Sequence, residues 1–189
     1  MNLTRRHWFS VCLAMATWPD VLAALEHAHN AAGPTSTRLE TLDAGMAAEI
    51  EAIAAQIIPS TNGPGASEAG VIYFIDRALS TFAADSVEAY RVGLEQAQEQ
   101  RKRLFPESTT IASLTGQQQM ALVQAIETSS FFELLRTHTV LGFLGNPSYG
   151  GNRDKVGWQQ IGFEDRMAYQ SPFGYYDAEI ANGNRGEKK

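Results

Sequence analysis

The stretch from Gly142 to Phe163 constrains the fold most strongly, because it holds six of the sixteen glycines of the chain. Glycine costs about 1 kcal/mol relative to alanine inside a helix, so such a run predicts a loop whose backbone takes positive φ or passes close to another surface. Large aromatic rings alternate with these glycines and can anchor a loop, and Asn146-Pro147 favours a tight turn. We therefore expect an ordered loop, which either binds a partner or closes the fold as a packed turn.

The sequence before this loop has helical periodicity. Apolar residues recur at spacings of three and four over residues 46–57 and 86–104 and in the segments that begin at Thr115 and Ser130. A further helix is expected over residues 71–82, although Val71–Ile75 taken alone could form a strand. The residues expected to face the core are Met46, Ile50, Ile53, Ile57, Val71, Ile75, Ala78, Leu79, Phe82, Val87, Tyr90, Leu94, Ala97, Leu104, Met120, Val123, Ile126, Phe131, Phe132, Leu135, Val140 and Phe143. The sequence thus predicts an all-α fold, an irregular bundle of about five helices with a Gly/aromatic-rich ordered loop and an extended C-terminal arm.

Residues that cap helices support this assignment. Asp43 can cap the first helix, and Pro59 follows its end. The segment Thr115–Gln118 has the form of a capping box for the fourth helix, and Ser130 is the expected cap of the fifth. Arg101–Arg103 ends the third helix, where cations suit the helix dipole.

Residues 1–31 are predicted to be a twin-arginine secretion signal. Arg5 and Arg6 precede an uncharged, largely apolar run of about 11 residues, which is shorter than the ~20 residues a membrane-spanning helix needs. The alternative is a buried N-terminal helix with two chance arginines. The signal predicts a periplasmic location and the twin-arginine translocase as a partner.

The remainder divides into three predicted parts. Residues 32–41, with a Gly-Pro-Thr-Ser-Thr run, are expected to form a linker. Residues 42–163 are expected to form one helical domain, since the chain is long enough for a single core. Residues 164–189 are expected to be a C-terminal arm followed by a disordered tail.

Several kinds of chemistry are disfavoured by the sequence. Cys12, the only cysteine, lies in the predicted signal, so we expect no thiolate site for zinc, iron–sulfur or covalent haem. His138 is expected to be packed or hydrogen-bonded rather than a metal ligand, because it stands alone among hydrophobic positions. The net charge of −6 argues against a nucleic-acid partner, and the glycine stretch lacks a nucleotide-binding fingerprint. We expect no catalytic residue, metal ligand or cofactor in this chain.

Aromatic residues concentrate near the C-terminus, with eight of the eighteen between Phe143 and Tyr176. Rings beside glycines and amides are typical of protein interfaces, because each ring supplies a large contact area at low entropic cost. The residues predicted to contact a partner are Asn146, Pro147, Tyr149, Gly150, Gly151, Asn152, Trp158, Phe173, Tyr175 and Tyr176.

Two blocks of the sequence carry a family resemblance. The first runs from Ile57 to Val71 and continues into Phe74-Ile75-Asp76, and the second is Asn-Pro-Ser-Tyr-Gly-Gly-Asn at residues 146–152 with Gly157-Trp158 downstream. In this order they resemble the small, third subunit family of gluconate 2-dehydrogenase and related flavin-dependent sugar dehydrogenases. The similarity covers roughly Leu42 to Phe163.

The resemblance implies a non-catalytic accessory subunit of a sugar or sugar-acid dehydrogenase. In such complexes the catalytic partner is a separate FAD-dependent flavoprotein of the glucose-methanol-choline type, often accompanied by a cytochrome c subunit with haem c. The resemblance further implies that the folded flavoprotein is exported with the subunit that carries the signal, and that any membrane association arises through the complex.

Two other functions remain open on the residues alone. One is an independent periplasmic sugar-binding protein, in which Trp158 stacks on the sugar and Asn146, Asn152 and Arg153 make polar contacts. The other is an enzyme in its own right, which the missing constellation of catalytic residues disfavours.

Overall fold

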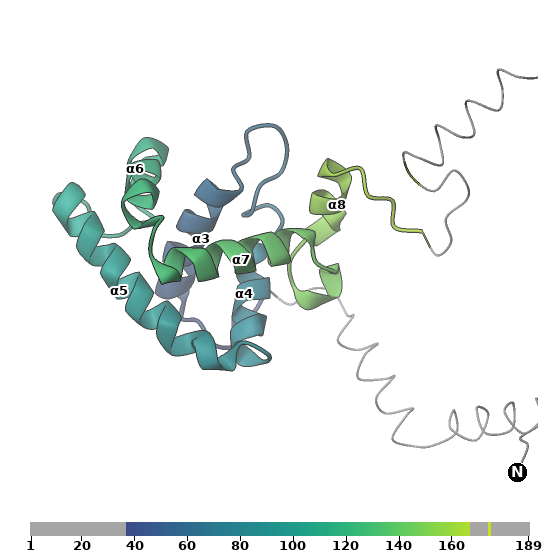
Figure 1. Ribbon diagram of the computed structural model, residues 1–189, viewed down its shortest axis with the longest axis horizontal. Coiled ribbons are helices and arrows are strands. Elements are labelled where there is room, and N and C mark those ends of the chain that lie inside the picture. Colours follow the sequence, from purple (N-terminus) through teal and green to yellow (C-terminus); the bar gives the residue numbers. More distant parts are fainter. Residues whose placement is uncertain (1–36, 167–173, 175–189) are drawn as a thin grey trace, which may run out of the picture. The chain divides into compact units, whose positions relative to one another are not determined.

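The computed structural model describes residues 37–166 and Gly174, and these residues contain helices and no strand (Figure 1). The predicted all-α fold is confirmed. The predicted signal residues Arg5 and Arg6 lie outside the described residues. The elements are α3 (Ala44–Ile57), α4 (Val71–Ser80), α5 (Val87–Leu104), α6 (Gly116–Ile126), α7 (Ser130–Leu144) and α8 (Val156–Gln160), with the 3-10 turns η1 (Ala84–Ser86), η2 (Pro147–Tyr149) and η3 (Arg153–Lys155).

The glycine-rich stretch contains more helix than expected. The sequence predicted a loop after the fifth helix, whereas η2, η3 and α8 all follow α7. Each is only three to five residues long, because positive φ angles at Gly150 and Asn152 separate η2 from η3, and positive φ angles at Asp154 and Lys155 precede α8.

Two of the three predicted helix caps are confirmed, and the prediction for the third helix is wrong by one residue. Asp43 Oδ1 accepts the N–H of Met46 at 2.8 Å, and Thr115 and Gln118 form the reciprocal capping box. The cap of α7 is Ser129 and not Ser130: its Oγ accepts the N–H of Phe132 at 3.1 Å. Ser129 has an extended backbone, with ψ 150°, whereas Ser130 is already the first helical residue.

The segment Val71–Ile75 is helical, so the strand alternative is wrong. This run begins α4, a ten-residue helix that is buried on almost every side. A helix buried all round is apolar all round, and over five residues it has the composition of a buried strand.

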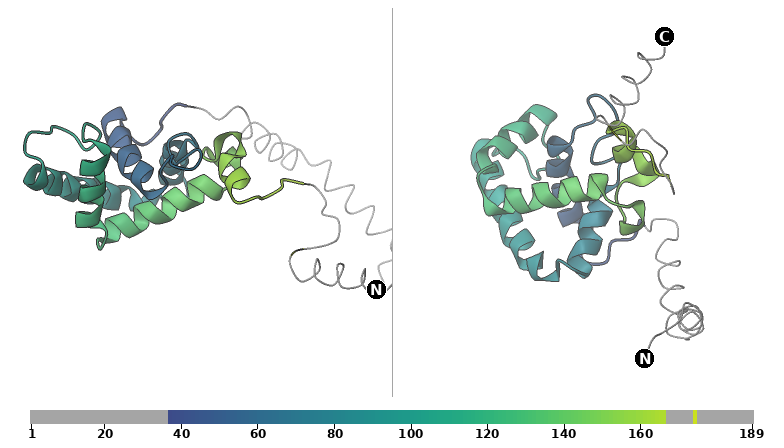
Figure 2. Two further views of the ribbon diagram at one scale, coloured as in Figure 1. Left: turned by 90° about the horizontal axis from the view of Figure 1, so that it is seen from above. Right: turned by 45° about the vertical axis from the view of Figure 1, so that its right-hand side comes forward.

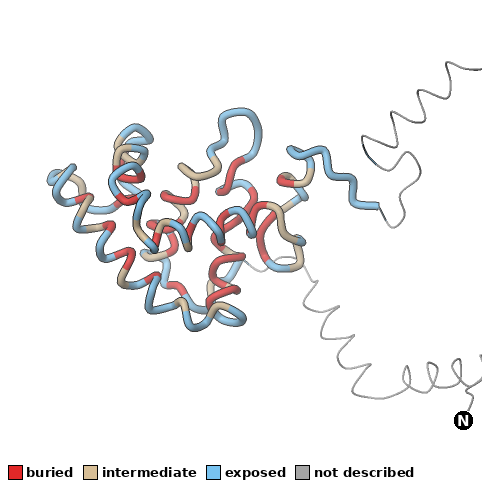
Figure 3. The backbone as a smooth tube through the Cα atoms, viewed as in Figure 1, coloured by how far each residue is buried: buried red, intermediate tan, exposed pale blue. Residues whose placement is uncertain are grey.

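One core is formed where α4 packs on α7, α5 on α6 and α7, and α3 on α4, α6 and α7. Figure 2 shows these helices from two further directions, and Figure 3 shows buried residues on their inward sides. Most residues predicted to face the core are buried or partly buried within it. Five are exposed instead: Phe82 (72%), Leu104 (45%), Met120 (40%), Val140 (40%) and Val87 (37%). Phe82 lies beyond the end of α4, Val87 and Leu104 are helix termini, and Met120 and Val140 lie on outward faces of α6 and α7.

Asp76 on α4 is a buried carboxylate that the sequence did not reveal as structural. Its side chain is 1% exposed and accepts three main-chain N–H groups, from Glu40 at 2.7 Å, Thr41 at 2.9 Å and Leu42 at 2.8 Å. Hydrogen bonds to a charged acceptor are stronger than neutral ones. Asp76 therefore fastens the segment that enters α3, including the end of the predicted linker, to α4.

A second buried polar cluster joins α3, α5 and the loop before α6. Glu49 accepts the N–H of Ile111 at 2.8 Å, and Arg101 donates to Gln98 at 2.6 Å and to the Ser108 hydroxyl at 2.9 Å. Burial raises the pKa of Glu49, against the opposing effects of the Ile111 N–H, Gln98 and Arg101. Arg101 is one of the three cations that end α5, but it turns inward and is 4% exposed, whereas Lys102 and Arg103 are exposed.

The described chain divides into two units between Gly157 and Trp158. The first contains α3 to α7, η1 to η3 and the start of α8. In the second, the Trp158 ring meets the Phe163 ring edge-on at 5.1 Å, and the Phe163 N–H donates to the Trp158 carbonyl oxygen at 2.8 Å.

Candidate functional site

The two glycine-containing blocks of the sequence meet at the first turns of α4. The Arg153 N–H donates to the Ala69 carbonyl oxygen at 3.0 Å, and Arg77 Nη1 donates to the Ser148 carbonyl oxygen at 2.9 Å. These bonds connect residues 148–153 to the start of α4 and its preceding turn. We call residues 145–157, which complete this arrangement, the closing loop.

The first block is shaped by Glu68. Its carboxylate accepts the Ser60 hydroxyl at 2.7 Å and the Gly65 N–H at 2.8 Å, and it is exposed. The Ser60 hydrogen bond lowers the pKa of Glu68, together with the main-chain bonds that it accepts. These contacts hold the turn that delivers the chain into α4.

Asn152 is the centre of the closing loop. Its side chain is fully buried, Nδ2 donates to the Gly145 carbonyl oxygen at 2.9 Å, and Oδ1 accepts the Gly157 N–H at 2.9 Å. Its backbone is left-handed, with φ 46°, a conformation that asparagine tolerates better than most residues. The amide thus ties the beginning of the loop to its end.

Two glycines bring the closing loop against the end of α7. A Cβ at Gly157 would lie 1.9 Å from the Phe143 carbonyl oxygen, and a Cβ at Gly151 would lie 2.2 Å from that of Gly142. No real side chain tolerates such distances to backbone atoms. These glycines are needed for close packing, which is the closure that the sequence left as one of two possibilities.

The closing loop also places a guanidinium against the first turn of α4. The Arg153 group lies over the Tyr73 ring, with Cζ 3.9 Å from the centroid, which is a cation–π contact. On Gly70, whose φ is +66°, an added Cβ would lie 2.6 Å from Arg153 Nε. Gly70 therefore leaves the space that the Arg153 side chain occupies.

The predicted contact residues differ in what they offer a partner. Tyr149 is 61% exposed, and Trp158 and Pro147 are partly exposed. Asn146 holds a turn by accepting the Ser148 N–H at 3.0 Å, while Gly150, Gly151 and Asn152 are buried inside the loop and act through its shape. Phe173, Tyr175 and Tyr176 lie outside the described residues. Among the described contact residues, Tyr149 is the most exposed ring of a tightly packed loop.

His138 is packed and hydrogen-bonded, as the sequence indicated. Its Nδ1 lies 2.9 Å from the Tyr90 hydroxyl oxygen in a buried pair whose rings are stacked. Burial lowers the pKa of His138 and raises that of Tyr90. This pair joins α5 to α7 and belongs to the core.

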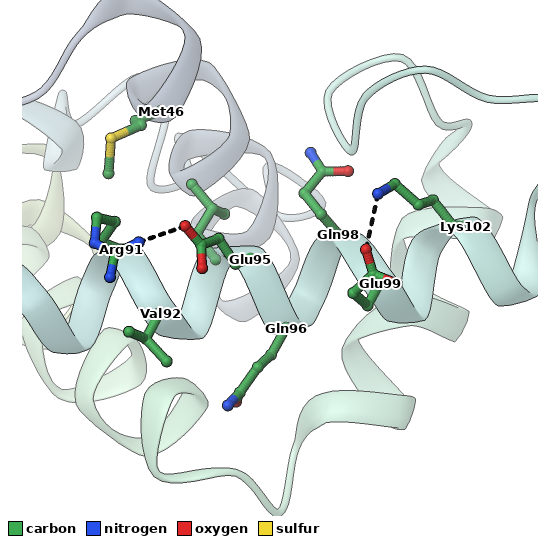
Figure 4. Close-up of a pocket in the computed structure, with 9 residues that line it drawn as sticks. Met46, Arg91, Val92, Glu95, Gln96, Gln98, Glu99 and Lys102 are labelled. Atoms are coloured by element: carbon green, nitrogen blue, oxygen red, sulfur yellow. Dashed lines mark hydrogen bonds and ion pairs between the residues drawn. The ribbon is translucent and has the colours of Figure 1, made fainter.

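A groove of about 640 Å³ lies between Met46 of α3 and one side of α5 (Figure 4). Its rim carries two exposed ion pairs, Arg91–Glu95 at 2.5 Å and Lys102–Glu99 at 2.8 Å. Burial of aromatic rings against a sugar is a common feature of carbohydrate sites, but the side chains that line this groove are aliphatic, amide or charged. The groove is not lined by any residue that the sugar-binding alternative named, which are Trp158, Asn146, Asn152 and Arg153.

Within residues 37–166 and Gly174, no three His, Cys, Asp or Glu side chains come together as a metal site. In the same residues, no helix has the length and apolar character to cross a membrane.

Comparison with known proteins gives one match. A family described as gluconate 2-dehydrogenase subunit 3 matches residues 44–165, which include both blocks and every helix described above. No curated protein and no solved structure matches the chain.

Proposed function

The chain belongs to the gluconate 2-dehydrogenase subunit 3 family, and from this we propose that it is the non-catalytic small subunit of a periplasmic FAD-dependent sugar or sugar-acid dehydrogenase. In this proposal it binds a flavoprotein of the glucose-methanol-choline type, supports its maturation and carries it through the twin-arginine route. FAD belongs to the partner, and a third, cytochrome subunit with haem c is compatible with the same assembly.

The observation that carries the proposal is the family match across the whole helical unit, at residues 44–165. The match includes the closing loop and the turn before α4, which lie together in the structure. A subunit that acts by binding needs a rigid surface, because ordering a mobile loop on association costs free energy. The buried Asn152 amide and the close glycine contacts supply that rigidity.

We propose the closing loop as part of the contact with the flavoprotein. Tyr149 is the residue best placed to act as an anchor, since its ring is 61% exposed on a loop whose backbone is packed. Tyrosine is enriched among interface residues whose truncation costs 2 kcal/mol or more, which corresponds to about thirtyfold weaker binding. Phe173, Tyr175 and Tyr176 remain proposed contacts in the same complex.

Co-purification tests the proposal directly. The full chain, tagged at its C-terminus and produced in its native host, should bring down a flavoprotein with bound FAD and sugar-dependent dye-reducing activity. The chain purified alone should be colourless and inactive. A flavin or haem spectrum in the isolated chain, or a native complex without any flavoprotein, would contradict the proposal.

A matched pair of variants tests the contact surface. Tyr149→Ala should lower recovery of the flavoprotein about thirtyfold while the melting temperature of the subunit stays near that of the wild type. Met120→Ala removes another exposed apolar side chain, from α6, and should leave binding unchanged. Equal binding by both variants would remove Tyr149 from the interface without affecting the assignment as a subunit.

A further inference from the structure

The Arg153 guanidinium has an unsatisfied edge. Its Nε and Nη2 atoms are buried and have no hydrogen-bond partner, and they are the only buried side-chain nitrogen or oxygen atoms in the described chain of which this is true. Burying donors of a charged group without acceptors is strongly unfavourable. The edge therefore requires an acceptor that residues 37–166 do not supply.

This edge is held in place by the surrounding chain. The Arg153 N–H is fixed on the Ala69 carbonyl oxygen at 3.0 Å, and the Tyr73 ring lies under the guanidinium with Cζ 3.9 Å from the centroid. Gly70 lies against the side chain so closely that even a methyl group would clash with it. The side chain is thus confined in one orientation in the free subunit.

The electrostatic environment of Arg153 also favours binding of an anion. The guanidinium lies at Gly70, the N-cap of α4, where the helix dipole is positive and the first turn has no acidic residue. Arg77, one turn after Tyr73, adds a second guanidinium, and its Nη1 donates to the neutral carbonyl oxygen of Ser148. Among the described residues no carboxylate pairs with Arg153 or Arg77.

The geometry of the free edge selects the class of anion. Nε–H and one Nη2–H of a guanidinium are parallel donors, and a carboxylate can accept both at once in a bidentate pair. Building on the proposed function, we propose that Arg153 binds the carboxylate of an acidic side chain of the flavoprotein partner. The exposed Tyr149 ring on the same loop provides the adjoining contact.

Access to the buried edge requires a local shift of the closing loop. The residues on either side of Arg153 have positive φ, 46° at Asn152 and 54° at Asp154, and Lys155 follows with 59°. Such conformations of residues other than glycine store conformational free energy and concentrate at binding sites. In this proposal a relaxation confined to Asp154 and Lys155 exposes the edge when the partner docks, while the Asn152 amide and the close glycine contacts hold the rest of the closing loop in place.

The first experiment compares stability and binding in Arg153→Met, with Arg136→Met on the exposed face of α7 as the control. Removing an uncompensated buried charge should leave the melting temperature of the isolated full chain unchanged or raise it. The same variant should bind the co-purifying flavoprotein about thirtyfold or more weakly, while the control binds normally. Normal binding by Arg153→Met would overturn the inference and leave the proposed function intact.

A crosslink identifies the acceptor if stability and binding change together. In Arg153→Lys, a carbodiimide should join the new amine to an acidic residue of the flavoprotein, and peptide mapping should locate that bond. Arg136→Lys should give no such crosslink. A crosslink confined to this chain, or none from position 153, would overturn the inference.

Two other outcomes distinguish the inference about Arg153 from binding of a small acid and from failure of the proposed function. If gluconate alone raises the melting temperature of the wild-type chain and not that of Arg153→Met, the carboxylate comes from a small acid and the partner contact is wrong. If the wild-type chain brings down no flavoprotein, the proposed function fails and the inference fails with it.

Discussion

The main-chain N–H of Arg153 donates to the carbonyl oxygen of Ala69 at 3.0 Å, and the four helices α4 to α7 lie between these two residues in the sequence. The closing loop is consequently part of the tertiary structure of the domain. A change at its packed positions should affect folding before it affects any partner.

Gly157→Ala should destabilise the subunit by about 3 kcal/mol or more, because its Cβ would lie 1.9 Å from the Phe143 carbonyl oxygen. Gly116→Ala is the control, since a Cβ there meets nothing within 4 Å at the first residue of α6. It should be neutral or stabilising by up to about 1 kcal/mol. Urea unfolding of the two variants measures the difference, and similar free energies of unfolding would refute the close packing.

Asp76→Ala should cost about 3 kcal/mol or more, because it leaves three N–H groups without their charged acceptor. Asp85→Ala removes an exposed carboxylate in η1 and should change the free energy of unfolding by less than about 0.5 kcal/mol. Hydrogen exchange should also show the amides of residues 40–42 losing protection in Asp76→Ala only. Retained protection would show that another acceptor holds this segment.

His138 should make the subunit less stable in acid. Its pKa is lowered by burial, so the unfolded chain takes up a proton first as the pH falls through 6.5, the ordinary pKa of histidine. The contribution of neutral His138 to the free energy of unfolding is therefore complete above pH 6.5. It is lost as the pH falls from 6.5 through the lower pKa of the folded state. Melting temperatures of the wild type and His138→Gln between pH 7.5 and 5 test this, and parallel curves would exclude His138 as the cause.

Glu49 should have the opposite effect. Its pKa is raised above 4.5, its ordinary value, mainly by burial, so the folded chain retains its proton to higher pH than the unfolded chain does. Stability relative to Glu49→Gln should thus increase as the pH falls from neutrality through the folded-state pKa towards 4.5. The free-energy difference between the two proteins, measured at several pH values, should show this slope, and a flat difference would contradict the raised pKa.

Replacing Arg5 and Arg6 together by lysine should hold the chain and its flavoprotein in the cytoplasm, if the twin-arginine route exports both. Cell fractionation with an activity assay measures the distribution of the complex. Single replacement of Arg38, an exposed arginine outside the predicted signal, is the control. Unchanged periplasmic delivery of the double variant would show that another route is used.

Local features of the sequence predicted the helices better than the contacts between them. Asp43 and the Thr115–Gln118 box act within three residues, so their roles could be predicted from the sequence alone. Asp76 could not, because its partners lie more than thirty residues away on a segment without a pattern of its own. Arg101 stands in the same stretch of sequence as Lys102 and Arg103, which are exposed. Only the tertiary packing distinguishes Arg101 from these two cations.

The candidate site was predictable in part for the same reason. Glycine content identified the closing loop, because backbone conformation is encoded locally. The juxtaposition of Arg153 with Tyr73 was not encoded in spacing, since it depends on how α7 returns the chain to α4. A lone arginine in a glycine-rich segment gives no sign that its donors are buried.

The three bonds to Asp76 set where an autonomous piece of this protein can begin. The family match starts at residue 44, after the N–H groups of Glu40, Thr41 and Leu42 that the carboxylate requires. A polypeptide cut at the matched boundary would lose all three of these donors and the segment that packs on Asp76, at a cost of about 3 kcal/mol or more, which is a large part of the stability of an ordinary domain. The folding unit therefore begins at or before Glu40, and the limits of sequence similarity are narrower than the limits of the cooperative structure.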